Sequence, residues 1–180
     1  MQIPIEQIVL TADKLMNKYG TRDPYELADA LNITILQRHF KSQLGAYTKV
    51  LHNRFIFIKE DLEPGLKKIV IYHELGHDRL HREYLAGCGA FQEFHLFNMK
   101  SDRMEYEANV FAAQLSLPDN EIIDLIRQGM DIQQAASYMN SDINLVALKV
   151  DTLRNRGFNF NRQEHSNTFL RFDKITLGPQ

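Results

Sequence analysis

The sequence predicts an α+β fold with a small three-stranded sheet. Helices precede and follow the three strands in the sequence. Three short runs, 33–40, 45–51 and 54–59, are rich in β-branched and aromatic residues and have the length of strands. The segments before and after them repeat their apolar residues at helical spacing. With 180 residues, 44% of them hydrophobic, the chain can build one domain with its own core.

Two helices are expected before the sheet. The first spans 5–19 and ends at Gly20, a residue typical of helix C-termini. Asp23 can cap the second, which begins with a proline at its first position and runs over 24–31. The dipeptide 52–53 is expected to form the tight connection between the second and third strands.

The segment 62–84 returns to helical spacing after the last strand. Asp61 is a possible N-cap, and Pro64 falls in the first turn, where proline is tolerated. Gly76 is a poor helix former and costs about 1 kcal/mol relative to alanine. A glycine at that place indicates that another backbone passes close to the helix.

This helix contains the sequence His-Glu-Leu-Gly-His, from His73 to His77. Two histidines four residues apart lie on one face of a helix, so both rings can bind one metal ion. Glu74 projects about 100° round the helix and can reach a metal-bound water as a general base. The pattern is that of zinc peptidases. Chance alone produces it in about one or two chains in a hundred, and a surface helix with solvated histidines is the alternative.

A third ligand is expected from the next helix, 101–117. Glu105 shares a face with Asn109 and two alanines, whose small size allows close packing against the metal helix. Glu107 lies about 200° away, so both glutamates cannot face one metal. We therefore expect Glu105 to bind the metal, Asn109 to hold a ligand histidine, and Glu107 to be solvated or to support the site. Glu105 also fits a capping box with Asp102, which needs no metal.

Taken together, the motif at 73–77, the pattern E-x-x-A-N-x-F-A-A at 105–113 and Leu117-Pro118 resemble the ImmA/IrrE family of metallo-endopeptidases. The segment 23–28 is also similar to that family, and the resemblance covers about residues 5–120. It implies a zincin-like core in which a small three-stranded sheet accompanies the metal helix and a second ligand helix. The implied cofactor is zinc, held by His73, His77 and Glu105, with Glu74 as the catalytic base.

The resemblance further implies one specific protein substrate, a helix-turn-helix repressor encoded beside the peptidase on a phage or mobile element. Its cleavage would relieve repression. Manganese or iron in place of zinc stays open, because availability as well as affinity selects the metal. An alternative from another class is a non-cleaving antirepressor or interaction module with a structural metal. Such a site has no use for Glu74 and needs a fourth ligand, such as His81 or Cys88.

Other residues near the motif are assigned supporting roles. His81 lies too far along the helix axis to join the first two histidines on one ion, so we expect it to support the site. Cys88 is expected to be an ordinary loop residue, and the aromatic-rich loop 85–100 to form either a substrate pocket or buried packing. The sheet whose strand 54–59 leads into the metal helix is a candidate platform for an added substrate strand. The possible oxyanion donors are Tyr47, Tyr72 and Tyr106.

After Pro118, three further helices are expected at 120–128, 132–139 and 142–156. We divide the chain into a metallopeptidase domain, 1–118, and a helical cap with a tail, 119–180, packed on the first. The last two helices also fit a helix-turn-helix, but acidic residues offset the few basic ones in the final helix, which favours a cap. The tail 159–180 has no assigned role.

Composition narrows the function classes. The net charge of −2 at pH 7 gives no overall attraction to nucleic acid, so no direct nucleic-acid binding is expected. No run of 18 apolar residues exists, and residues 1–10 lack the features of a signal peptide, so neither a membrane span nor export is expected. The single cysteine cannot form an internal disulfide, which fits a cytoplasmic location.

Overall fold

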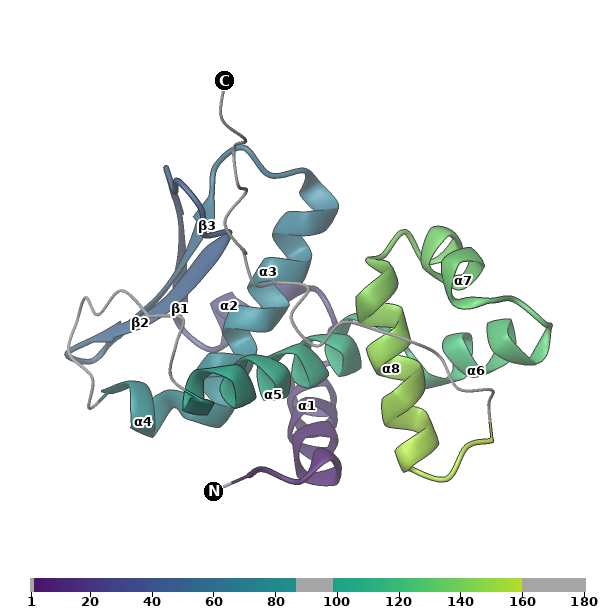
Figure 1. Cartoon of the computed structure of the whole chain (residues 1–180). Helices are drawn as coiled ribbons and strands as arrows, with labels where there is room; N and C mark the ends of the chain where they lie inside the picture. Colours follow the sequence, from purple (N-terminus) through teal and green to yellow (C-terminus); the bar gives the residue numbers. More distant parts are fainter. Residues whose placement is uncertain (1, 87–98, 160–180) are drawn as a thin grey trace.

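A three-stranded mixed sheet forms one side of the molecule in the computed structural model, which describes residues 2–86 and 99–159 (Figure 1). The strand order is β1-β3-β2, with bounds Ile33–Arg38, Asn53–Lys59 and Gly45–Val50 respectively. β1 runs parallel to the central strand β3, and β2 runs antiparallel to it. The α+β prediction is confirmed, although the first strand ends two residues earlier than expected.

Two helices precede the sheet, and their ends follow the predicted capping signals. α1 spans Ile5–Tyr19 and ends at Gly20, whose positive φ of 69° suits glycine. α2 spans Pro24–Ala30, and the carboxylate of Asp23 accepts hydrogen bonds from two backbone N–H groups of its first turn.

The connection between β2 and β3 differs from the prediction by one residue. Asn53 pairs with Val50 and belongs to β3, so the turn consists of Leu51 and His52. Leu51 has a φ of 56° and is 84% exposed. The prediction was wrong because asparagine is the residue that normally takes a positive φ in such turns, whereas here leucine does.

The predicted 62–84 helix is divided into three parts. α3 spans Pro64–Gly76, a π-helix follows over His77–His81, and α4 completes the segment over Arg82–Ala86. Glu63, and not Asp61, occupies the N-cap position, and its side chain makes no capping hydrogen bond. The start was misplaced because proline fixes the first helical turn at Pro64. The π-helix was missed because a pattern search assumes 3.6 residues per turn throughout.

α5, Met99–Ser116, crosses α3 and also contacts α1 (Figure 1). A Cβ atom added to Gly76 would lie 3.0 Å from the Cα and 3.1 Å from the carbonyl oxygen of Ala108. The expectation that another backbone passes close to Gly76 is therefore confirmed, and that backbone belongs to α5.

Three C-terminal helices pack beside this core: α6 (Asp119–Arg127), α7 (Ile132–Tyr138) and α8 (Ile143–Asn155). Eight residues of α8 are buried, and it packs on α5 within one continuous hydrophobic cluster. This packing is compatible with a helical cap, and the division into a domain and a cap stays a prediction. The predictions for Cys88, for most of loop 85–100 and for nearly all of tail 159–180 lie outside the described residues.

No helix in the ranges 2–86 and 99–159 is both long enough and apolar enough to cross a membrane.

Candidate metal centre

The structure brings His73, His77 and Glu105 together where α3 and α5 cross. The Nε2 atoms of the two histidines lie 3.0 Å apart. The Glu105 carboxylate approaches both rings, at 3.1 Å from His73 Nε2 and 3.4 Å from His77 Nε2. Within the described residues, these three form a group whose potential ligand atoms all lie within 4.8 Å of one another. The facing argument for Glu105 over Glu107 thus agrees with the geometry.

The chemistry of this group suits a divalent transition metal. Two imidazole nitrogens and one carboxylate are a usual three-ligand set for zinc with a position left for water. Burial raises the pKa of Glu105, but His77 and His73 outweigh it and lower the pKa well below its usual range. Burial lowers the pKa of His73, whereas Glu105 raises it, to about 8 overall. The carboxylate is therefore ionised and ready to bind a cation.

Asn109, one turn after Glu105 on α5, contacts the ring nitrogen of His73 that points away from His77 and Glu105. Its Oδ1 lies 2.8 Å from His73 Nδ1, and both side chains are buried. If Nδ1 donates to the amide oxygen, Nε2 is left without a proton and faces the group of ligand atoms. This is the position that the sequence analysis expected for Asn109.

Glu74 lies against β2 and is 6% exposed. Burial raises the pKa of its carboxyl group, whereas the charges of His73 and His77 and, to a smaller extent, a hydrogen bond from the backbone N–H of Tyr47 lower it. A Cβ atom added to Gly45 would lie only 2.9 Å from Glu74 Oε1 and 2.4 Å from Val70 Cγ1. The start of β2 therefore approaches the glutamate closely because residue 45 has no side chain. Sequence reasoning did not single out Gly45, although a glycine in a strand can signal close approach.

Glu107 is buried rather than solvated, with an exposed fraction of 3%. Its Oε2 lies 2.9 Å from His81 Nε2, and the other ring nitrogen of His81 lies 3.1 Å from His77 Nδ1. The expectation that His81 supports the site agrees with this arrangement. Of the two roles left open for Glu107, the solvated charge was wrong, because Glu107 packs beneath the π-helix.

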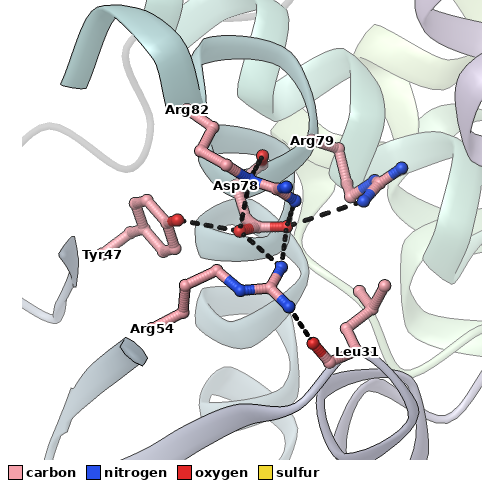
Figure 2. Close-up of polar contacts among 6 residues, drawn as sticks. All are labelled: Leu31, Tyr47, Arg54, Asp78, Arg79 and Arg82. Carbon is pink, nitrogen blue, oxygen red and sulfur yellow. Dashed lines mark hydrogen bonds and ion pairs between the residues drawn. The ribbon is translucent and has the colours of Figure 1, made fainter. Parts of the chain in front are cut away.

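A buried carboxylate directly after His77 joins the sheet to the metal helix (Figure 2). Asp78 accepts a hydrogen bond of 2.8 Å from Tyr47 Oη of β2 and contacts Arg54 Nη1 of β3 at 3.1 Å. Arg82 Nη2 reaches it at 2.7 Å, and Arg54 also donates to the carbonyl oxygen of Leu31. Sequence reasoning missed this network, because its members come from separate elements and no local pattern links them.

Two of the three tyrosines considered as oxyanion donors make hydrogen bonds elsewhere. Tyr47 donates to Asp78, and Tyr72 donates to the carbonyl oxygen of Arg22 at 2.8 Å. Burial raises the pKa of Tyr106, with a further contribution from the nearby charge of Asp151 on α8. None of these contacts directs a tyrosine hydroxyl toward the metal ligands.

Comparison with known proteins identifies the family of the chain. Residues 28–151 match the peptidase M78 family, described as the IrrE N-terminal-like domain. "Uncharacterized immunity region protein 2" of Bacillus phage phi105 is 36% identical over 117 residues, covering 64% of this chain and 72% of the relative. "Metallopeptidase ImmA" of Bacillus subtilis (strain 168) is 31% identical over 131 residues, covering 70% of this chain and 73% of the relative. The predicted resemblance is thereby confirmed: the chain has a zincin-like fold and belongs to the peptidase M78 family of metallopeptidases, that of the IrrE N-terminal-like domain.

Proposed function

We propose that this chain is a zinc-dependent endopeptidase that cleaves one specific protein, a DNA-binding transcriptional repressor, and so relieves repression. The observation that carries the proposal is the buried convergence of two histidines and a glutamate beside a second buried glutamate. A structural site would have no need for that second carboxyl group.

In this proposal, His73, His77 and Glu105 hold the metal, and Glu74 is the catalytic base. Zinc bound there supplies Lewis acidity for a peptide carbonyl group and for water. Glu74 takes a proton from the attacking water and delivers it to the leaving amine. Its burial favours this role, because a raised pKa makes the carboxylate a better proton acceptor.

The outer edge of β2, which pairs with no further strand among the described residues, is the candidate platform for the substrate. Both edges of β3 are paired, so the strand named in the sequence analysis cannot itself receive another strand. Among the described strands, β2 pairs with β3 alone, and it contacts α3. The hydrogen bond from Tyr47 N–H to Glu74 places this edge beside the proposed base. An extended substrate segment added there would gain backbone hydrogen bonds with little dependence on sequence.

The repressor assignment draws its support from the relatives. One of them carries the name of an immunity region protein of a phage, and the family resemblance seen in the sequence implies a helix-turn-helix repressor as the substrate. A repressor substrate and a single cysteine both fit a cytoplasmic location. We further propose that residues 1–118 form the metallopeptidase domain and that 119–180 act as its cap and tail.

The non-cleaving alternative requires a closed metal site. His81 does not supply the fourth ligand, because its two ring nitrogens face His77 Nδ1 and Glu107. Cys88, the other residue considered for that role, lies outside the described residues.

The test is incubation of the repressor encoded beside this gene with wild-type protein, with Glu74→Gln and with Glu63→Gln. Glu63 is an exposed glutamate at the start of the same helix and provides the matched control. We expect cleavage by the wild type and by Glu63→Gln, no cleavage by Glu74→Gln, and equal bound zinc in all three. Tight repressor binding without cleavage by any of them would instead favour the antirepressor.

A further inference from the structure

We propose that His81 and Glu107 form a hydrogen-bonded relay that positions His77 and determines which of its ring nitrogens is free for the metal. The proposal rests on the proposed function, because it takes His77 as a metal ligand. It assigns a role to two buried polar side chains that the cleavage reaction itself does not use.

The relay begins on the far side of the His77 ring. The Nε2 atom of His77 faces His73 and Glu105, whereas its Nδ1 atom lies 3.1 Å from His81 Nδ1. His81 Nε2 then lies 2.9 Å from Glu107 Oε2. The chain of contacts therefore runs from the ligand histidine through a second histidine to a carboxylate.

One arrangement of protons satisfies these contacts and leaves His77 able to bind a metal. A histidine that ligates through Nε2 carries its proton on Nδ1. The Nδ1 of His81 must then accept that hydrogen bond, so the proton of a neutral His81 sits on Nε2 and is donated to Glu107. The opposite tautomer of His81 would place its own proton on Nδ1, and His77 would then have to protonate Nε2 and lose its ligand atom.

Glu107 is itself held firmly by groups outside the relay. Its second oxygen, Oε1, accepts hydrogen bonds from the backbone N–H of Ile3 at 2.9 Å and from Arg103 Nε at 3.1 Å. These donors occupy one carboxylate oxygen and leave the other for His81. The carboxylate thus acts as a fixed acceptor, which is what orienting a histidine ring requires.

The π-helix over His77–His81 contains both histidines of the contact between His77 and His81. It follows directly on α3 and carries His77 at its start and His81 at its end. The two rings lie 5.3 Å apart between centroids and are tilted by 51°. His73 needs no such intermediary, because Asn109 reaches its Nδ1 directly. Helix α5 thus supports one histidine through an amide and the other through the relay.

The experiment measures zinc affinity by competition with a chromophoric chelator, for the full chain and three variants. His81→Phe removes both hydrogen bonds and keeps a ring, and we expect a zinc Kd raised by about 10–100-fold. His81→Gln retains an acceptor and a donor on one side chain, so it should recover part of that loss. His39→Phe makes the same change at a histidine whose side chain is 79% exposed and lies outside the relay, so it is the matched control, with an expected affinity equal to the wild type.

Long-range ¹H–¹⁵N spectra of the zinc-loaded protein provide a readout that a merely structural role would not change. We expect a His77 Nδ1 proton that exchanges slowly in the wild type, rapidly in His81→Phe, and at an intermediate rate in His81→Gln. Wild-type affinity in both His81 variants, or an equal loss in His39→Phe, would overturn the relay and leave the peptidase proposal intact. A wild type that binds no zinc would overturn the proposed metal site and the relay with it.

Discussion

Replacing Gly76 by alanine tests whether the close approach of α3 and α5 holds the metal ligands in place. The added methyl group would lie 3.0 Å from the Cα, 3.1 Å from the carbonyl oxygen and 3.2 Å from the Cβ of Ala108. Two of these atoms belong to the backbone of α5, which cannot rotate away as a side chain can. The helices must therefore separate by a few tenths of an ångström.

The magnitude follows from two opposing effects. Alanine gains about 1 kcal/mol over glycine in a helix interior, whereas forcing an extra methyl group into a packed contact costs about 1–3 kcal/mol. Gly65, in the first turn of the same helix, has no atom within 4 Å of an added Cβ. Gly65→Ala therefore carries the backbone effect without the steric one, and we expect Gly76→Ala to be less stable than Gly65→Ala by about 1–3 kcal/mol.

Urea unfolding of the metal-free proteins, with equal m-values required, measures that difference. Zinc affinity measured on the same samples should fall in Gly76→Ala alone, because Glu105 moves with α5. If the two variants unfold at free energies within about 0.5 kcal/mol of each other, as ordinary surface substitutions do, the close contact does not constrain the helices and the reasoning fails.

Three further substitutions probe other parts of the structure. Gly45→Ala would place a methyl group 2.9 Å from Glu74 Oε1, so we expect the cleavage rate to fall about tenfold or more with bound metal unchanged. Asp78→Ala should lower the free energy of unfolding in urea by about 3–5 kcal/mol, because Arg54 loses its carboxylate partner in a largely buried setting. Burial lowers the pKa of Lys149 from 10.5 to about 8, despite its contact with an aspartate. Between about pH 8 and pH 10.5 the unfolded chain keeps the Lys149 proton that the folded chain has released. The free energy of unfolding of the wild type, measured in urea relative to Lys149→Met, should therefore rise with pH across this range.

The parts of the site that sequence could predict are those encoded within one helix. The spacing of His73 and His77 places two rings on one face whatever surrounds them, and the position of Glu105 among small residues identifies the face that packs inward. Gly76 was informative for a similar reason. Glycine lowers the stability of a helix, so its presence inside one indicates that a neighbouring backbone leaves no room for a side chain. Each of these inferences needs only helical geometry and the properties of single residues.

The parts that sequence could not predict depend on contacts between distant segments. Asp78 looks like an ordinary surface acid in a helical pattern, yet it is 1% exposed. Its partners Tyr47 and Arg54 lie 31 and 24 residues away along the chain. Strand order was equally hidden, because three short strands permit several arrangements, and the one observed leaves β2 at an edge. Glu107 was ambiguous because its acceptor role depends on where the π-helix places His81.

The crossing of the two metal-site helices explains why so many roles fall on a short stretch of α5. Glu105, Glu107 and Asn109 each contact a histidine of the preceding helical segment: Glu105 the two proposed ligands, Asn109 the first of them, and Glu107 the third histidine. Ala108 lies among these residues and meets Gly76 at the point of closest approach. A shift of this contact therefore moves a ligand and both supporting acceptors together. Helix packing and metal affinity should consequently change in concert, even for substitutions that remove no polar group.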